Sequence, residues 1–200
     1  MSLPPRLVLA SDNRGKLAEL NQRLAELPVQ ALAQTEFGIH SAAETGLTFI
    51  ENALLKARHA SRLSGLPALA DDSGLEVPAL EGRPGIYSAR FAGPDATDAD
   101  NIQLLLTQMQ TLTAAQRRAR FYCALVYLRH AQDPTPLVCL GSWEGEILPT
   151  PRGRGGFGYD PVFHDPKLGL TAAELPADLK NQLSHRGQAM AKLIEELTAL

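Results

Sequence analysis

Residues 6–20, RLVLASDNRGKLAEL, combine three local patterns in one short stretch. The apolar run RLVLA (6–10) is typical of a short buried strand. Four leucines that follow recur at helical spacing before Pro28: Leu17, Leu20, Leu24 and Leu27. The polar residues between these patterns therefore occupy a strand-to-helix loop, the unit from which α/β folds are built.

The rest of the chain continues this alternation and then changes to strands. Two capping boxes, at Thr48–Glu51 and in TDAD (97–100), predict helix starts, and the first of these helices is expected to stop near Gly65. A last helix is expected to open at Ser184. Three further stretches have the composition of strands: 67–77, 119–128 and 136–148. Because the last two runs are close in sequence, we expect them to be antiparallel neighbours in a mixed sheet with flanking helices.

Composition indicates one domain covering residues 1–200. The chain has 44% hydrophobic residues and no repeat or linker-like tract. A net charge of -3 gives no basic field for nucleic acid or an anionic membrane surface. The two cysteines lack metal-ligand spacing, and no apolar segment has the length of a bilayer span or a signal peptide. We therefore expect a cytoplasmic protein that binds neither nucleic acid nor membranes.

The loop SDNRGK (11–16) is a candidate phosphate site. A helix N-terminus offers unpaired N–H groups and a partial positive charge, and Lys16 adds a full charge. The spacing is not that of a Walker A loop. A polar turn with an exposed lysine is the alternative from this stretch alone.

ADDSG (70–74) follows an apolar run, at the position where open α/β sheets place ligands. Alternation along a strand points Asp71 and Asp72 in opposite directions. One of them is expected to hold a divalent cation or activate water while the other meets backbone or solvent. An Asx turn capped by Gly74 is the alternative.

Two later stretches have features of a nucleotide-base site. In GGFGYDPVF (155–163), glycines allow close approach of a ligand, and Phe157 and Tyr159 can present a flat face or edge. LKNQLSHRGQ (179–188) gathers Lys180, His185 and Arg186 around a helix start, where cations are unfavourable unless something negative lies nearby. A β-bend with core aromatics is the alternative for the first stretch.

Taken in order, five stretches resemble the inosine triphosphate pyrophosphatase family, in particular its bacterial members acting on dITP and XTP. The stretches are LASDNRGKLAEL, ETGLTFIENALLKARHA, LADDSGLEVPALEGRPGIYSARFAG, GGFGYDPVF and LSHRGQAM. The resemblance implies an elongated mixed sheet whose two lobes enclose a nucleotide cleft, and it implies a homodimer. Tyr127 and Trp143, in the strand-rich region, are our expected dimer face.

The resemblance also implies roles for individual residues. The triphosphate would be held by Ser11, Asp12, Asn13, Arg14, Gly15 and Lys16. Asp72 would be the general base and, with Glu44, would bind Mg²⁺, while Ser73 would touch the nucleotide. The base would meet Phe157, Gly158, Tyr159 and Asp160, with Lys180, His185 and Arg186 on the other side. Ser11 stands where relatives often have threonine, and Ala43 where they often have a second acid.

These roles agree with the chemistry of the implied reaction. Water would attack the α-phosphorus of ITP, dITP or XTP, and pyrophosphate would leave as a magnesium complex. Donors that meet O6, from His185, Arg186 or the backbone, would reject adenine, whose 6-amino group has no acceptor to offer them. Rejection of dGTP would need a tight surface formed by the backbone of the glycine-rich run, against which the 2-amino group of guanine finds no hydrogen-bond partner.

Three other interpretations compete with this one. The first is a Maf-type nucleotide pyrophosphatase, whose motifs differ from GGFGYDPVF and SHRGQ. The second is a nucleotide sensor that has lost catalysis, although Lys16, Glu44 and Asp72 are all present. The third is a structural α/β domain with polar loops.

Overall fold

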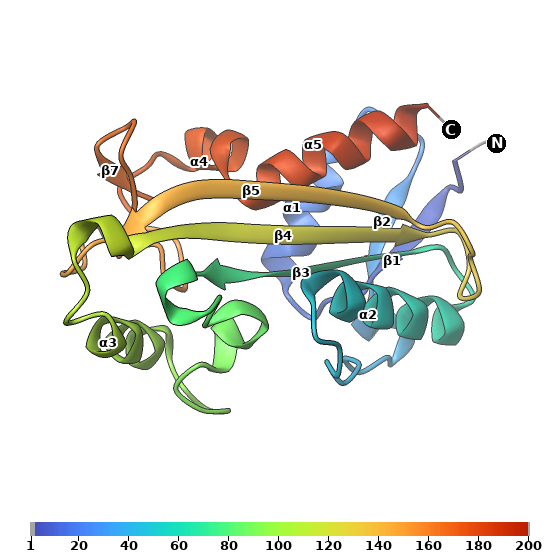
Figure 1. Ribbon diagram of the computed structural model, residues 1–200. Coiled ribbons are helices and arrows are strands. Elements are labelled where there is room, and N and C mark those ends of the chain that lie inside the picture. Colours follow the sequence, from blue (N-terminus) through green and yellow to red (C-terminus); the bar gives the residue numbers. More distant parts are fainter. Residues whose placement is uncertain (1–2, 200) are drawn as a thin grey trace. The chain divides into compact units, whose positions relative to one another are not determined.

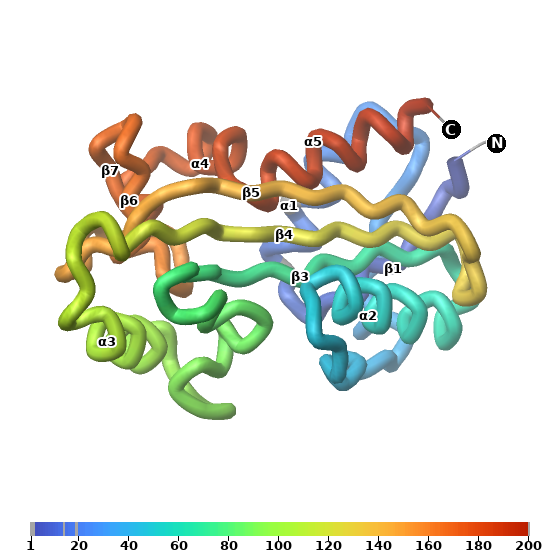
Figure 2. Tube along the Cα trace, viewed as in Figure 1, coloured from blue at the N-terminus to red at the C-terminus, as the bar shows by residue number. Residues whose placement is uncertain are grey.

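The computed structural model describes residues 3–199, without the side chains of Arg14 and Glu19. Figures 1 and 2 show the course of the chain. The helices are α1 (Arg14–Arg23), α2 (Phe49–Ser64), α3 (Asp98–Gln108), α4 (Ala177–Leu183) and α5 (His185–Thr198). The strands are β1 (Arg6–Leu9), β2 (Gln30–Ala33), β3 (Ala68–Glu76), β4 (Arg118–Leu128), β5 (Leu137–Ile147), β6 (Phe163–Asp165) and β7 (Leu170–Thr171). Short 3-10 helices lie at Gln34–Phe37, Pro78–Leu80, Gly85–Arg90 and Ala114–Arg117.

The strands form one mixed sheet of seven in the order β2-β1-β3-β4-β5-β6-β7. β1 is parallel to both β2 and β3, whereas β6 is antiparallel to β5 and β7. The predicted α/β class with a mixed sheet is confirmed, and β4 and β5 are neighbours as expected. β2, β6, β7 and α4 were not predicted, because elements this short carry too little periodicity to be seen in sequence.

Two compact units divide the chain, and each is described by itself. The first unit comprises 1–72, 123–140 and 189–200, and the second comprises 73–122 and 141–188. The single domain and the cleft implied by the resemblance stay predictions.

In the first unit, helices cover both faces of the strands, α1 and α5 on one side and α2 on the other (Figure 1). Leu7 and Leu9 of β1 pack into the cluster that also holds Leu20 of α1 and Leu193 of α5. Val8, between the two leucines, is completely buried as well. A strand buried on both faces reads as a continuous apolar run, which is why RLVL predicted β1.

Helix α2 begins and ends where its sequence predicts. Thr48 accepts from the N–H of Glu51, the Glu51 side chain accepts from the N–H of Thr48, and Gly65 ends the helix in the left-handed conformation. Three fully buried alanines form its inner face: Ala53, Ala57 and Ala60. Their small size allows the helix axis to lie close to β1 and β3.

The second unit has its own aromatic core. The Phe121 ring lies 4.4 Å from that of Phe163 and 6.4 Å from that of Trp143. Trp143 is 5% exposed and donates its indole N–H to Asp165 over 2.9 Å. Tyr127, in the first unit, is 2% exposed. The expectation that Tyr127 and Trp143 form an exposed dimer face is therefore wrong, because the chain itself buries both rings.

Among the described residues, no helix combines the length and apolarity that crossing a bilayer requires.

Candidate active site

The stretch SDNRGK joins β1 to α1: residues 11–13 form the loop, and residues 14–16 are already the first turn of the helix. Asn13 caps α1: its Oδ1 accepts from the N–H groups of Gly15 (2.8 Å) and Lys16 (3.1 Å). The Asn13 N–H in turn donates to the hydroxyl of Ser11 over 3.2 Å. These local bonds fix the loop, and they occupy two of the helix N–H groups that were expected to face a phosphate. The side chain of Arg14 lies outside the described part of the structure.

Asp12 turns away from the helix and is held by two polar side chains. Its carboxylate accepts from the Gln34 amide (2.7 Å) and the Ser41 hydroxyl (2.9 Å). These two bonds lower the pKa of Asp12, so the group stays ionised. Gln34 is only 1% exposed, which makes it a fixed support of the loop. Neither Gln34 nor Ser41 was identified from sequence, because their stretch contains no motif.

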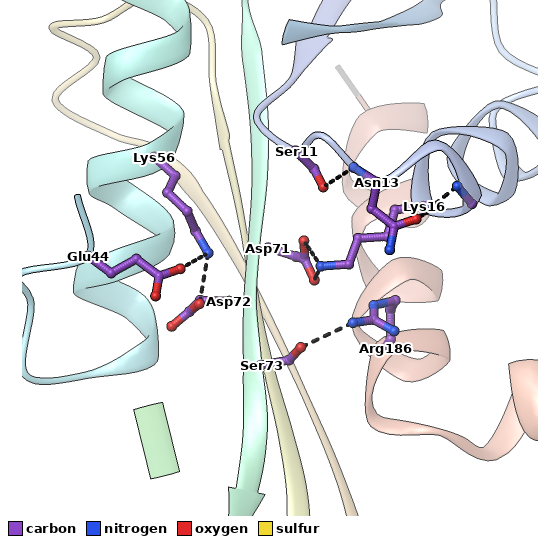
Figure 3. Close-up of polar contacts among 10 residues, drawn as sticks. Ser11, Asn13, Lys16, Glu44, Lys56, Asp71, Asp72, Ser73 and Arg186 are labelled. Atoms are coloured by element: carbon purple, nitrogen blue, oxygen red, sulfur yellow. Dashed lines mark hydrogen bonds and ion pairs between the residues drawn. The ribbon is translucent and has the colours of Figure 1, made fainter. Parts of the chain in front are cut away.

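Lys16 points from α1 to Asp71 on β3 (Figure 3). Its Nζ lies 2.9 Å from each carboxylate oxygen. The expectation that the second acid of ADDSG meets backbone or solvent is therefore wrong, since Asp71 is buried and paired with the predicted phosphate-binding lysine.

Asp72 points to the opposite side of β3, toward α2 (Figure 3). Lys56 of α2 places its Nζ 2.7 Å from Asp72 Oδ1 and 3.0 Å from Glu44 Oε1. The two carboxylates predicted to share a metal ion are thus brought together, with a buried ammonium group bridging them. Lys56 was missed in the sequence analysis. The signal was available, because two carboxylates in one buried place call for a cation.

The charges of this group shift one another's protonation. Burial raises the pKa of Asp72, and Lys56 only partly opposes that effect. For Lys56, burial alone lowers the pKa, but Asp72, Asp71 and Glu44 outweigh it and raise the pKa above its usual value. A carboxylate that binds protons more readily than usual suits a general base.

Both acids lie in the middle of β3, not at its end. β3 runs from Ala68 to Glu76, so the strand continues for four residues beyond Asp72. The polar residues DDSG resembled a strand end, but Leu75 and Val77 beyond them are fully buried and hold the backbone extended. The Asx-turn alternative is excluded as well.

The second unit presents an exposed aromatic ring beneath two cations. Phe157 is 63% exposed. Lys180 Nζ and Arg186 Cζ lie 5.2 Å and 5.7 Å from the centre of its ring. Arg186 also donates to the hydroxyl of Ser73 over 3.1 Å (Figure 3). Phe157, Lys180, Arg186 and Ser73, four predicted site residues, therefore form one group.

Asp160 holds Phe157 and Lys180 of this group in place. It is 4% exposed, accepts from the N–H of Phe157 over 2.8 Å and pairs with Lys180. Gly156 leaves no room for a side chain, because an added Cβ would collide with the Asp160 carboxylate. Gly158 donates its N–H to Asp98 over 2.6 Å. The glycines thus serve the packing of the turn, with Phe157 as its exposed face.

Tyr159 and His185 were expected to meet the nucleotide base, but the rings of both pack within the protein. Tyr159 is 4% exposed and donates its hydroxyl to the carbonyl of Ser88 over 2.9 Å, so it anchors the turn and does not present its ring. His185 stacks on Phe121, with ring centres 4.8 Å apart and planes at 16°. Tyrosine and histidine are intermediate in burial, so composition alone does not tell whether their rings face the core or a ligand.

The residues around Asp72 fit a magnesium ion. Asp72 Oδ2 is a buried oxygen that has no hydrogen-bond partner in the part of the chain that the structure describes, and Glu44 is held nearby through Lys56. Mg²⁺ takes one or two carboxylates and completes its shell with water and phosphate. Within the described part of the chain no three acidic, histidine or cysteine side chains form a metal cluster, so a protein-only metal cage is absent there.

Comparison with known proteins places this site in a family. The profile of the Ham1 family matches residues 7–196. The chain belongs to the Ham1 family. It is 58% identical over 192 residues to the dITP/XTP pyrophosphatase of Shigella flexneri, covering 96% of this chain and 98% of that protein. It is also 58% identical over 194 residues to the dITP/XTP pyrophosphatase of Halorhodospira halophila, covering 97% and 98%.

Solved structures agree with this assignment. A HAM1 protein from Coxiella burnetii superposes with a TM-score of 0.95 at 49% identity, covering 98% of this chain and 100% of that one. A nucleoside-triphosphatase / dITP/XTP pyrophosphatase from Mycobacterium abscessus gives a TM-score of 0.81 at 41% identity, covering 94% and 98%. The family expected from the five sequence stretches is confirmed, and the Maf-type and purely structural interpretations are set aside.

Proposed function

We infer that this Ham1 protein is a nucleoside triphosphate pyrophosphatase that hydrolyses dITP, XTP and ITP to the monophosphate and pyrophosphate. The observation that carries this inference is the full-length similarity to proteins named dITP/XTP pyrophosphatase. The activity removes deaminated purine nucleotides before they enter DNA or RNA.

The phosphates are proposed to meet the loop at the start of α1. Lys16 is the main cation there, and its pairing with Asp71 keeps the ammonium group in place before substrate arrives. The Ser11 hydroxyl and the Asn13 amide N–H supply further donors, and Gly15 keeps the backbone of this turn close to the phosphates while its own N–H stays in the Asn13 cap. Asp12 supports the loop through Gln34 and Ser41 and does not itself meet an anion.

The reaction is proposed to need a metal ion, Mg²⁺, held by Glu44 and Asp72. When bound, the ion would neutralise charge on the phosphates and on the leaving pyrophosphate. Lys56 pairs with both carboxylates and holds them close to each other. Asp72 takes the proton of the water that attacks the α-phosphorus, while the bond between the α-phosphorus and the bridging oxygen to the β-phosphate breaks.

The base is proposed to lie against Phe157. An exposed ring is a platform for any purine, and stacking alone does not discriminate among purines. Discrimination is assigned to donors that meet O6, with Arg186 the foremost because its guanidinium lies over the same ring. Lys180 and Ser73 complete the polar surroundings, and His185 contributes only through a ring nitrogen because its face is stacked on Phe121.

The remaining expectations belong to this proposal. We place the enzyme in the cytoplasm, where the nucleotide precursors are, and expect it to bind neither nucleic acid nor membranes. We also expect it to be a homodimer, with no interface assigned.

Product analysis tests the proposal. The purified protein is incubated with Mg²⁺ and, in parallel, dITP, XTP, dATP, dGTP and dTTP, and the nucleotide products are separated. Monophosphate with pyrophosphate from dITP and XTP, and little product from the other three, is the expected result. Diphosphate with inorganic phosphate, or ready turnover of dGTP, contradicts the proposal.

A further inference from the structure

The sequence motif T-x-x-[ED]-N occurs at the start of two helices, and the two asparagines differ in one respect. Thr48 to Asn52 opens α2, and Thr97 to Asn101 opens α3. In both, the threonine and the acid form the capping box, and the asparagine lies one residue further along the helix. Both asparagines are buried, at 0% and 2% exposure.

Both polar atoms of the Asn101 side-chain amide form hydrogen bonds with backbone groups. Its Oδ1 accepts from the N–H of Ala92 (2.8 Å), and its Nδ2 donates to the carbonyl of Ala89 (3.3 Å). The side chain is thus fully satisfied by the loop before the helix. Its function is to hold that loop.

Asn52 uses one end in the same way. Its Oδ1 accepts from the N–H of Gly46 over 2.8 Å. A Cβ added at Gly46 would lie 2.6 Å from Glu51 Cβ and 2.8 Å from Asn52 Oδ1, so only glycine allows this approach. The loop held in this manner is the one that carries Glu44, two residues before Gly46.

Unlike Nδ2 of Asn101, Nδ2 of Asn52 makes no hydrogen bond to a described backbone carbonyl. This Nδ2 is buried and has no hydrogen-bond partner among the described residues, and the same is true of Asp72 Oδ2. A buried donor and a buried acceptor left unsatisfied each cost free energy, so their pairing is favourable.

The position of Asn52 on α2 favours pairing of its Nδ2 with Asp72 Oδ2. Asn52 and Lys56 are four residues apart and therefore lie on one face of α2. Lys56 contacts Asp72 Oδ1 at 2.7 Å. The helix face that brings Lys56 to Oδ1 of this carboxylate therefore also carries Asn52, one turn earlier.

We propose that Asn52 is a positioning residue of the active site, whose Oδ1 fixes the loop presenting Glu44 and whose Nδ2 orients the Asp72 carboxylate. The proposal rests on the function inferred above. Groups that orient metal ligands typically change metal affinity or activity when they are lost.

The test compares Asn52→Leu with Asn101→Leu, since both remove a buried amide from the same motif. Mn²⁺ affinity is measured by electron paramagnetic resonance without nucleotide, followed by kcat and KM for dITP and the thermal midpoint. We expect Asn52→Leu to weaken Mn²⁺ binding and lower kcat, each by about 10- to 100-fold. Asn101→Leu is expected to lower the thermal midpoint while both quantities stay within about twofold of the wild type.

Asn52→Asp covers the case in which Asn52→Leu does not fold. It keeps an oxygen for the Gly46 N–H and replaces the donor toward Asp72 by a charged acceptor, so kcat is expected to fall at least about tenfold with little change in KM. Wild-type kcat in Asn52→Asp, or equal behaviour of the two leucine variants, overturns the proposal. If the wild type releases no pyrophosphate from dITP, the inferred function fails, whereas the Mn²⁺ titrations still decide the role of Asn52.

Discussion

Asp72 is buried and binds Lys56 through one oxygen, while its other oxygen has no hydrogen-bond partner within residues 3–199 as described. Replacing it by asparagine removes the proton acceptor and one metal ligand while leaving the side-chain shape unchanged. We expect kcat for dITP to fall by about 10²- to 10⁴-fold, the usual range for a general base. Steady-state kinetics measure this, and calorimetric titration with dITP checks that the nucleotide still binds.

Asp71→Asn is the matched control, because the adjacent acid lies on the other side of β3 and pairs with Lys16. It is expected to change KM more than kcat. Equal kcat in wild type and Asp72→Asn would remove Asp72 from the chemistry. A wild type that binds dITP without turnover would revive the interpretation as a sensor.

Phe157 is the exposed ring on which the base is proposed to stack. Stacking of one base on an aromatic side chain contributes about 1–3 kcal/mol, so Phe157→Ala should raise the dissociation constant for dITP by about 5- to 150-fold. Titration of the metal-free protein with dITP measures it. Tyr159→Phe is the control: it removes only the buried hydroxyl bond to Ser88, and should lower thermal stability with an unchanged dissociation constant. Unchanged binding of dITP by Phe157→Ala together with weaker binding by Tyr159→Phe would contradict the assignment of Phe157 as the stacking ring.

The turn between β4 and β5 depends on one buried carboxylate. Asp133, 1% exposed, accepts from the N–H groups of Arg129 and Thr135 (3.0 Å each) and from the Arg129 guanidinium. The Arg129 side chain, followed by smaller contributions from backbone N–H groups, holds the pKa of Asp133 well below its usual range. Ionised Asp133 therefore stabilises the fold above the usual aspartate pKa, and this stabilisation is lost as the pH falls toward the lower folded-state pKa.

Asp133→Asn is accordingly expected to lower the free energy of unfolding by about 2–3 kcal/mol at neutral pH, the range for hydrogen bonds to a charged group. The difference from the wild type should shrink as the pH is lowered below about 4, where aspartate in the unfolded chain becomes protonated. Urea unfolding at pH 7 and at lower pH measures it. A difference that does not change with pH would show that the charge of Asp133 is unimportant.

Helices with explicit end signals could be predicted to the residue, and short elements could not. The boxes at Thr48 and Thr97 define α2 and α3, and the apolar run at 6–10 defines β1. α1 ends at Arg23 although its leucine spacing continues to Leu27, because periodicity records which side chains are buried and not where hydrogen bonding stops. The two- to four-residue strands β2, β6 and β7 exist only through their neighbours in the sheet.

At the scale of the whole molecule, five ordered motifs sufficed for the family, while the internal arrangement of the site depended on the fold. Sequence identified Asp72 and Glu44 but not Lys56, whose importance lies in bridging the two carboxylates. It identified the loop at Asp12 but not Gln34, a residue in a stretch without any motif. It identified the aromatic run but not which ring is exposed, since that depends on the core around Phe121 and Phe163.

The reaction proposed for this enzyme depends on attack of water at the α-phosphorus of a deaminated purine triphosphate. The most direct measurement is hydrolysis of dITP in ¹⁸O-enriched water, with mass spectrometry of both products. One ¹⁸O atom in dIMP and none in pyrophosphate is the predicted result. Label in pyrophosphate, or in inorganic phosphate released beside dIDP, would contradict the proposed position of attack and the role assigned to Asp72.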